Sequence, residues 1–172
     1  MEILFLGTAA ATATPLPFCR CPACQAGRRE GGKNLRRRSS VLIDGEILID
    51  LGPDFASACF ESGVSSAEIG CLLQTHSHSD HFDAGHLITR IPEYATENPR
   101  PMQIVASGAC LTHMSERLAR EEEGATLLAA SWREKLGVEI VRAAHGDRLR
   151  YKNYEIHCLE SAHDPSDESM MY

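Results

Sequence analysis

The sequence has 172 residues, of which 43% are hydrophobic, so it can form one globular domain over residues 1–172. Its formal net charge of −7 at pH 7 argues against a broad electrostatic contact with nucleic acid. No stretch approaches the roughly 20 apolar residues of a membrane span, and the first residues lack the basic region of a signal peptide. We therefore expect a cytoplasmic, soluble protein with no membrane partner.

The first half of the chain predicts strands and a helix separated by one long loop. An Asp44-Gly45 pair between two apolar runs indicates a β-hairpin. Prolines, glycines and cysteines together indicate a loop that something other than a core must hold. In chain order we predict a strand, this loop, two hairpin strands, a helix and a buried strand, at residues 3–6, 9–33, 40–43, 46–51, 55–63 and 69–74.

The second half predicts one helix and four more strands. Ser107 is a helix-capping residue, and Lys152-Asn153 is placed to turn the chain between two strands. We predict a strand, a helix and three strands at residues 104–105, 109–123, 138–141, 148–151 and 154–160.

Four residues with metal-binding side chains follow the buried strand at 69–74: His76, His78, Asp80 and His81. Imidazole nitrogens and carboxylate oxygens suit zinc, and alternation along an extended loop brings several of them toward one point. The alternative is a polar surface loop that happens to be rich in histidine. The other histidines have no partner at ligand spacing and are expected to be ordinary: His86, His113, His145 and His157.

The chain has seven cysteines, and three of them crowd together at Cys19, Cys21 and Cys24. An odd number with this spacing suits metal thiolates better than a secreted disulfide framework, although three free cysteines in a loop are the alternative. The other four are expected to be ordinary buried thiols: Cys59, Cys71, Cys110 and Cys158.

The pattern His-x-His-x-Asp-His after a hydrophobic strand resembles the signature of the metallo-β-lactamase superfamily. The resemblance implies an α/β (α+β) fold, an αββα sandwich, and two divalent ions, zinc or manganese. It implies that His76 and His78 hold the first ion, while Asp80 and His81 hold the second. His163 follows a predicted strand and fits the third ligand of the first ion. Asp80 and His163 are the residues implied to be catalytic.

Two further segments extend the resemblance. Residues 47–52 are similar to the superfamily strand ending in Asp-x-Gly, which implies that Asp50 orients a ligand imidazole; a simple turn aspartate is the alternative. The opening Phe5-Leu6-Gly7-Thr8 and the cysteines resemble the accessory phosphodiesterases of the carbon-phosphorus lyase pathway and the B proteins of pyrroloquinoline quinone biosynthesis. That resemblance implies one structural zinc at Cys19, Cys21 and Cys24. The basic run 36–38 is either a solvated charge run or a phosphate contact.

The implied function is a metal-dependent hydrolase. The leading hypothesis is a phosphodiesterase that uses a metal-bound hydroxide to attack a small or cyclic phosphate ester. Thioester or β-lactam hydrolysis and tRNA processing of the ribonuclease Z kind are other hydrolase alternatives. A non-hydrolytic metal-binding accessory protein of cofactor biosynthesis is the alternative from a different class. A di-iron flavoprotein is disfavoured, because those enzymes place glutamate where this chain has His78.

Parts of the superfamily pattern are missing after His163. The resemblance implies a bridging aspartate, a last histidine and a fourth ligand for the structural zinc, and we assign none of them within residues 164–172. We expect the parent protein to be longer and the sandwich to be truncated in its second half. An unfinished second sheet exposes apolar surface or a strand edge, so self-association, for example as a homodimer, is also expected.

Overall fold

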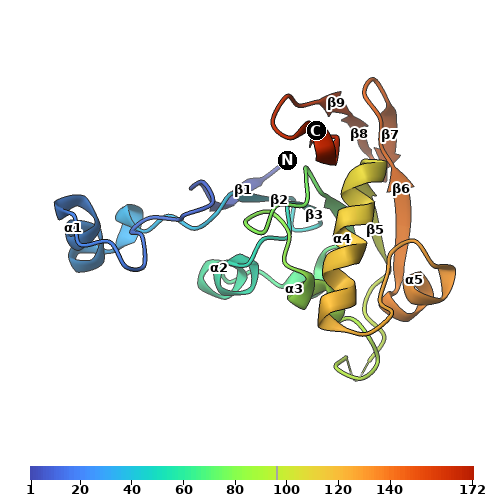
Figure 1. The fold of residues 1–172 in the computed structure, drawn as a ribbon, viewed down its shortest axis with the longest axis horizontal. Coiled ribbons are helices and arrows are strands. Elements are labelled where there is room, and N and C mark those ends of the chain that lie inside the picture. The colour runs from blue at the N-terminus through green and yellow to red at the C-terminus, as the bar shows by residue number, and fades with distance from the viewer. Residues whose placement is uncertain (96) are drawn as a thin grey trace.

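The computed structural model describes residues 1–95 and 97–172. Its centre is a six-stranded sheet in which neighbouring strands follow one another in the sequence, from β1 to β6 (Figure 1). The first three strands pair antiparallel, and the last four, starting from β3, pair parallel. The strands are β1 (Ile3–Gly7), β2 (Ser40–Ile43), β3 (Ile47–Ile49), β4 (Cys71–Leu73), β5 (Met102–Ala106) and β6 (Val138–Arg142).

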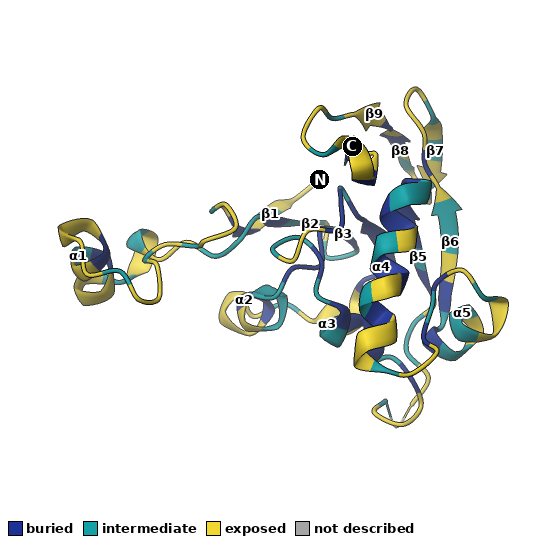
Figure 2. Ribbon diagram, viewed as in Figure 1, coloured by how far each residue is buried: buried dark blue, intermediate teal, exposed yellow. Residues whose placement is uncertain are grey.

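Two hydrophobic cores lie on opposite faces of this sheet. Because side chains alternate along a strand, Leu72 enters one core while Cys71 and Leu73 enter the other. The first core is covered by α2 (Phe55–Ser62), α3 (Ala84–Ile88), α4 (Gly108–Glu121) and α5 (Ala130–Leu136). The second is covered by the hairpin of β7 (Arg148–Tyr151) and β8 (Tyr154–His157) and by the pair β9 (Leu159–Glu160) and β10 (Met170–Met171). The buried residues therefore form a layer on each side of the sheet (Figure 2).

The hairpin at Asp44-Gly45 is confirmed. β2 and β3 pair in register, with Ile43 opposite Ile47. Asp44 and Gly45 have φ of 48° and 69°, the left-handed values of the primed turns that match the twist of a two-stranded ribbon. The predicted helix caps are also confirmed: Ser107 accepts a hydrogen bond from the backbone N–H of Cys110 at 3.0 Å, and Gly63 ends α2 in the left-handed conformation.

The prediction of a loop over residues 9–33 is wrong in its second half. Residues Pro22–Glu30 form helix α1, and Gly32–Asn34 form a short 3-10 turn. Cys21 caps α1 through its sulfur, and Pro22 occupies the first turn, where its missing N–H costs no hydrogen bond. Figure 1 shows α1 at the end of an extended arm, apart from the sheet.

Further differences concern short elements. The predicted strand 154–160 is divided into β8 and β9, because β8 pairs with β7 while β9 pairs with β10. Helices α3 and α5 were not predicted, since their five and seven residues are too short for a periodic pattern. The four scattered cysteines are buried, as expected. None of the helices in the described ranges is long and apolar enough to cross a membrane.

Candidate metal centre

Three histidines from two distant parts of the sequence lie together at the carboxyl end of β4. Ligand nitrogens of His76, His78 and His163 all lie within 4.8 Å of one another. Two nitrogens bound to one tetrahedral zinc at 2.0–2.1 Å are about 3.4 Å apart, so small side-chain movements bring all three to one ion. His76 is buried, while His78 and His163 are exposed, so the cluster opens to solvent on one side.

The hydrogen bonds of His76 determine which of its nitrogens is free. The Thr75 hydroxyl lies 2.9 Å from each Asp50 oxygen and must donate to this carboxylate, so it accepts from His76 Nδ1 at 2.8 Å. His76 Nε2 is then an acceptor. It is buried and has no hydrogen-bond partner among the residues that the structure describes. Burial, together with neighbouring imidazoles, lowers the pKa of His76 to about 4, so at neutral pH this nitrogen presents a lone pair to the cluster.

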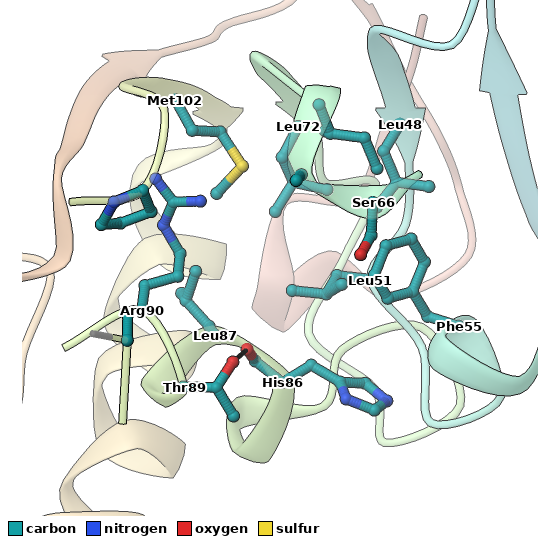
Figure 3. Close-up of a pocket in the computed structure, with 14 residues that line it drawn as sticks. Leu48, Leu51, Phe55, Ser66, Leu72, His86, Leu87, Thr89, Arg90 and Met102 are labelled. Carbon is teal, nitrogen blue, oxygen red and sulfur yellow. Dashed lines mark hydrogen bonds between the residues drawn. The ribbon is translucent and has the colours of Figure 1, made fainter. Parts of the chain in front are cut away.

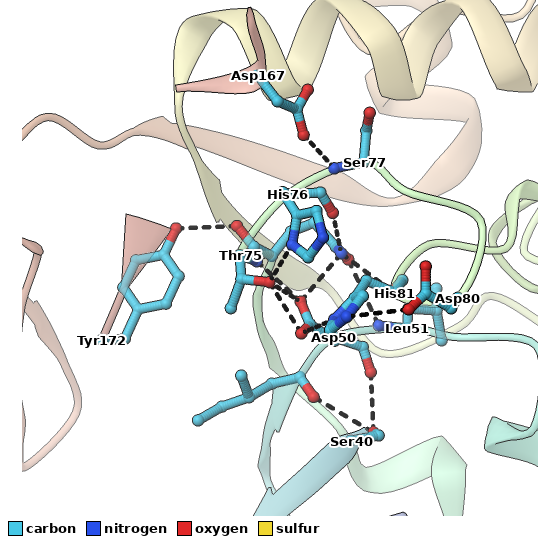
Figure 4. Close-up of polar contacts among 12 residues, drawn as sticks. Ser40, Asp50, Leu51, Thr75, His76, Ser77, Asp80, His81, Asp167 and Tyr172 are labelled. Carbon is cyan, nitrogen blue, oxygen red and sulfur yellow. Dashed lines mark hydrogen bonds and ion pairs between the residues drawn. The ribbon is translucent and has the colours of Figure 1, made fainter. Parts of the chain in front are cut away.

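Asp50 is the centre of the hydrogen-bond network beneath the histidines (Figure 4). Its carboxylate, only 4% exposed, accepts from the backbone N–H of Thr75 at 2.8 Å, from the Gln74 amide at 3.0 Å and from His81 Nδ1 at 2.6 Å. Because β3 and β4 are parallel neighbours, Asp50 and the histidine loop leave the sheet at the same edge. The structure thus places Asp50 against His81, where the resemblance implied an orienting role.

Asp80 and His81, the two residues assigned to a second ion, also lie side by side. His81 Nε2 is 3.3 Å from Asp80 Oδ2. Burial alone would lower the pKa of His81, but the hydrogen bond and charge of Asp50 outweigh it, and the pKa is raised. When His81 is neutral, the bond from Nδ1 to Asp50 leaves Nε2 as the free nitrogen, facing the Asp80 carboxylate.

Sequence reasoning missed one carboxylate at the cluster. Asp164 Oδ2 lies 2.9 Å from His78 Nε2, and its other oxygen accepts from the Ser166 N–H at 3.0 Å. The Ser166 contacts and, to a smaller extent, His78 lower the pKa of Asp164, so the group is an anion at neutral pH. The residue after His163 therefore places a carboxylate beside the cluster, while the bridging aspartate and the last histidine stay unassigned. The signal was available, because Asp164 directly follows a predicted ligand.

Gln74 was missed as well. It is completely buried at the end of β4, and its side-chain amide lies 2.7 Å from the carbonyl of His76 and 3.0 Å from that of His81. A buried amide must satisfy its donors, so Gln74 fixes both ends of the histidine loop. A polar residue at the end of a predicted buried strand was the only local hint.

The three cysteines of the arm also form a cluster. Ligand sulfurs of Cys19, Cys21 and Cys24 lie within 4.8 Å of one another. Arg28 of α1 holds the preceding loop by donating to the carbonyl of Cys19 at 2.7 Å and to that of Pro17 at 3.0 Å. The backbone N–H of Cys24 and the neighbouring thiols lower the pKa of Cys21 to about 7, which favours the thiolate that a metal needs.

Three other residues singled out in the sequence have polar partners in the structure. In the basic run, Arg38 forms an ion pair with Asp54 at 2.9 Å and Arg37 pairs with Glu61, and all four side chains are partly exposed. His113, expected to be an ordinary histidine, has Nδ1 2.6 Å from the Asp167 carboxylate.

A pocket of about 230 Å³ lies on the helix-covered side of the sheet (Figure 3). Its lining includes Leu72 of β4, Phe55 of α2 and His86 of α3, but none of the predicted ligands. His86 Nε2 is 3.3 Å from the carbonyl of Pro53 and does not join the histidine cluster. The pocket therefore belongs to the packing of α2 and α3 against the sheet rather than to the metal centre.

Solved structures with the same arrangement of elements are metallo-β-lactamase-fold proteins. The chain superposes on the metallo-β-lactamase fold protein YhfI from Bacillus subtilis with a TM-score of 0.60 over 98% of its length, at 14% sequence identity. The chain has the metallo-β-lactamase fold. Zinc-bound PqqB from Methylobacterium extorquens gives a TM-score of 0.66 at 20% identity over 93% of the chain, and a diphosphatase of the PhnP family gives 0.62 at 22% identity over 91%.

One curated relative matches in sequence. Coenzyme PQQ synthesis protein B of Methylobacterium radiotolerans is 30% identical in an alignment of 102 residues that covers 52% of this chain and 34% of that protein. The chain spans 55% and 56% of the solved diphosphatase and PqqB chains. No family model matches the sequence.

Proposed function

We propose that the protein is a metal-dependent hydrolase that acts on a small or cyclic phosphate ester. The observation that carries the proposal is His76 Nε2, a buried acceptor without a partner among the described residues, on a ring whose centroid lies 4.8 Å from those of His78 and His163. A buried nitrogen left without a hydrogen bond costs about 1–3 kcal/mol, and a divalent cation at this point would remove that cost. The three imidazoles therefore fit a metal ion.

His76, His78 and His163 would hold the first ion, and Asp80 and His81 a second, with the Asp164 carboxylate beside His78. When bound, such ions lower the pKa of a coordinated water to about 7 and polarise phosphoryl oxygens. Asp50 and Thr75 keep the imidazoles in the tautomers that leave Nε2 free. The fold shared with a PhnP-family diphosphatase supports a phosphate ester as the substrate.

We also propose that Cys19, Cys21 and Cys24 hold a structural zinc. Three sulfurs within 4.8 Å supply most of a tetrahedral thiolate site. Because the arm lies apart from the sheet in Figure 1, the role of this ion would be to fold the arm.

A second candidate function follows from the curated relative. The matching protein takes part in the synthesis of coenzyme PQQ, so a metal-binding accessory protein of cofactor biosynthesis, without hydrolytic turnover, is the alternative.

The test combines metal analysis with turnover of bis-p-nitrophenyl phosphate by the protein loaded with zinc or manganese. We expect His78→Ala to lose more than about 100-fold in rate, because loss of even an outer partner of a ligand costs about 10- to 100-fold. The matched control is His157→Ala, since His157 is an exposed histidine that contacts only Glu155 in the described network. Metal bound at the histidines without turnover would favour the accessory function, and no metal at the histidines would refute both.

A further inference from the structure

Asp167 is a buried carboxylate outside the predicted ligand set. It ends the short 3-10 turn Pro165–Asp167, four residues after His163, and is only 1% exposed. A carboxylate in such a place must be fully hydrogen-bonded, because burying an unpaired charge is very costly. Its partners therefore show which parts of the fold it holds together.

Those partners come from two other segments. One oxygen accepts from the backbone N–H of Ser77, and the other lies 2.6 Å from Nδ1 of His113 on α4. The carbonyl of Asp167 also accepts from the hydroxyl of Ser107, the residue that caps α4, at 2.7 Å. One residue thus links the loop after His163 to the histidine loop and to the first turns of α4.

The contact with Ser77 matters most, because Ser77 stands between His76 and His78. Its N–H belongs to the segment that carries two of the three clustered histidines, and its acceptor is 90 residues later in the sequence. The third histidine is in the loop that Asp167 anchors. This carboxylate therefore links the two halves of the cluster, as does the N–H of Met170, which bonds the carbonyl of Thr75 at 2.8 Å.

We propose that Asp167, held by His113, is a positioning residue that sets the distance between His163 and the pair His76 and His78. This inference rests on the proposed metal site and deepens it. Asp167 has no contact with any of the three imidazoles among the described hydrogen bonds, so it acts on the ion only through the relative placement of the two loops that carry them.

The test is the binding of cobalt(II) to the metal-free protein. Calorimetry measures the affinity, and visible absorption reports the imidazole-bound ion. Thiolate-bound cobalt in the arm is distinguished by its near-ultraviolet charge-transfer band. Asp167→Asn keeps the size of the side chain but removes its charge, and we expect cobalt at the histidines to bind about 10- to 100-fold more weakly. We also expect the cobalt complex of Asp167→Asn to absorb visible light more weakly than that of the wild type, because the ion has lost a nitrogen ligand.

The matched control is Ser115→Ala on α4, the helix that carries His113. Ser115 is buried and accepts from the N–H of Leu127 at 3.0 Å, so its loss removes a buried hydrogen bond that involves neither Asp167 nor the loop of His163. We expect lower stability in this variant with unchanged cobalt affinity. Equal weakening in Asp167→Asn and Ser115→Ala would overturn the proposal, because affinity would then follow stability alone.

A double variant separates positioning from general loosening. In a His163→Ala background Asp167→Asn should change cobalt affinity less than twofold, since the distance that Asp167 sets then has a ligand at one end only. A further tenfold loss in that background contradicts the proposal. If Asp167→Asn does not fold, His113→Gln removes one partner at the more exposed end, and an unchanged affinity there overturns the inference. Wild-type cobalt binding that is insensitive to His76→Ala refutes the metal site itself.

Discussion

Replacement of Asp50 by asparagine tests the network that selects the histidine tautomers. Asparagine has nearly the same shape and tolerates the left-handed backbone at this position, where φ is 64°, so the change adds no backbone strain. If the amide oxygen occupies the place of Oδ1, the bonds from Gln74 and from the Thr75 N–H survive. The amide nitrogen then faces His81 Nδ1, where the carboxylate oxygen was 2.6 Å away.

The expected loss is therefore one charge-assisted hydrogen bond. Such a bond contributes about 1.5–3 kcal/mol, so we expect Asp50→Asn to lower the free energy of unfolding by about 2 kcal/mol in the metal-free protein. His81 can accept from the new amide only by moving its proton to Nε2. We expect this tautomer to place an N–H toward Asp80 and to abolish His81 as a ligand.

The pH dependence has a definite sign. Asp50 raises the pKa of His81 in the folded protein, so the stability from the protonated pair is full below the unfolded value near 6.5 and is lost as pH rises through the folded value. Without the carboxylate, burial dominates and the pKa of His81 should fall. The stability difference between wild type and Asp50→Asn should thus be larger at pH 6 than at pH 9.

Urea unfolding at both pH values, with imidazole nitrogen NMR of His81, provides the assay. Thr75→Val serves as a control because it removes the hydroxyl beside Asp50 but leaves the bond to His81. A His81 ring that titrates identically in wild type and Asp50→Asn, or a destabilisation below about 0.5 kcal/mol, would refute the proposed role of the network.

Three further predictions concern the same region and the arm. The pKa of His76, about 4 in the folded protein against 6.5 when free, means that metal-free protein loses stability as pH falls from 6.5 to 4. Between pH 7 and 5 the loss should be about 2 kcal/mol, seen in urea unfolding and absent in His76→Asn. Gly52→Ala should destabilise the histidine loop and weaken metal binding, measured by calorimetry, because a Cβ there would lie 2.5 Å from the carbonyl oxygen of Asp80. Changing Cys21 to serine should remove one equivalent of bound metal and leave metal binding at the histidines intact, which mass spectrometry of the metal content measures. Loss of metal from both clusters would contradict two independent sites.

Local patterns in the sequence predicted most of the sheet and the first part of the candidate site. The predictions of the Asp44-Gly45 turn and of the strand before Thr75 each use only residues that are close together in the sequence. Both elements are confirmed in the structure. The convergence of His163 on His76 could be inferred only through the family resemblance, since no local pattern spans a separation of 87 positions.

The residues that were missed act through partners far along the chain. Asp167 meets Ser77 and His113, which are 90 and 54 positions away. Helix α1 was missed for a different reason, because prolines and glycines around the cysteines indicate a loop unless the capping sulfur of Cys21 is considered. Single-sequence patterns suggest candidate ligands but leave their supporting hydrogen bonds unassigned.

The candidate centre combines rigid support with one unsatisfied atom. Asp50, Gln74 and Thr75 satisfy nearly every donor and acceptor around the histidine loop, while His76 Nε2 alone among the described buried side-chain nitrogens and oxygens is left without a partner. Folding without metal must accept that cost because the neighbouring bonds fix the ring in place. A loop whose only purpose was structural would gain by turning this nitrogen to water or to a donor. The arrangement therefore favours a site selected for binding a cation over a polar loop that is merely rich in histidine.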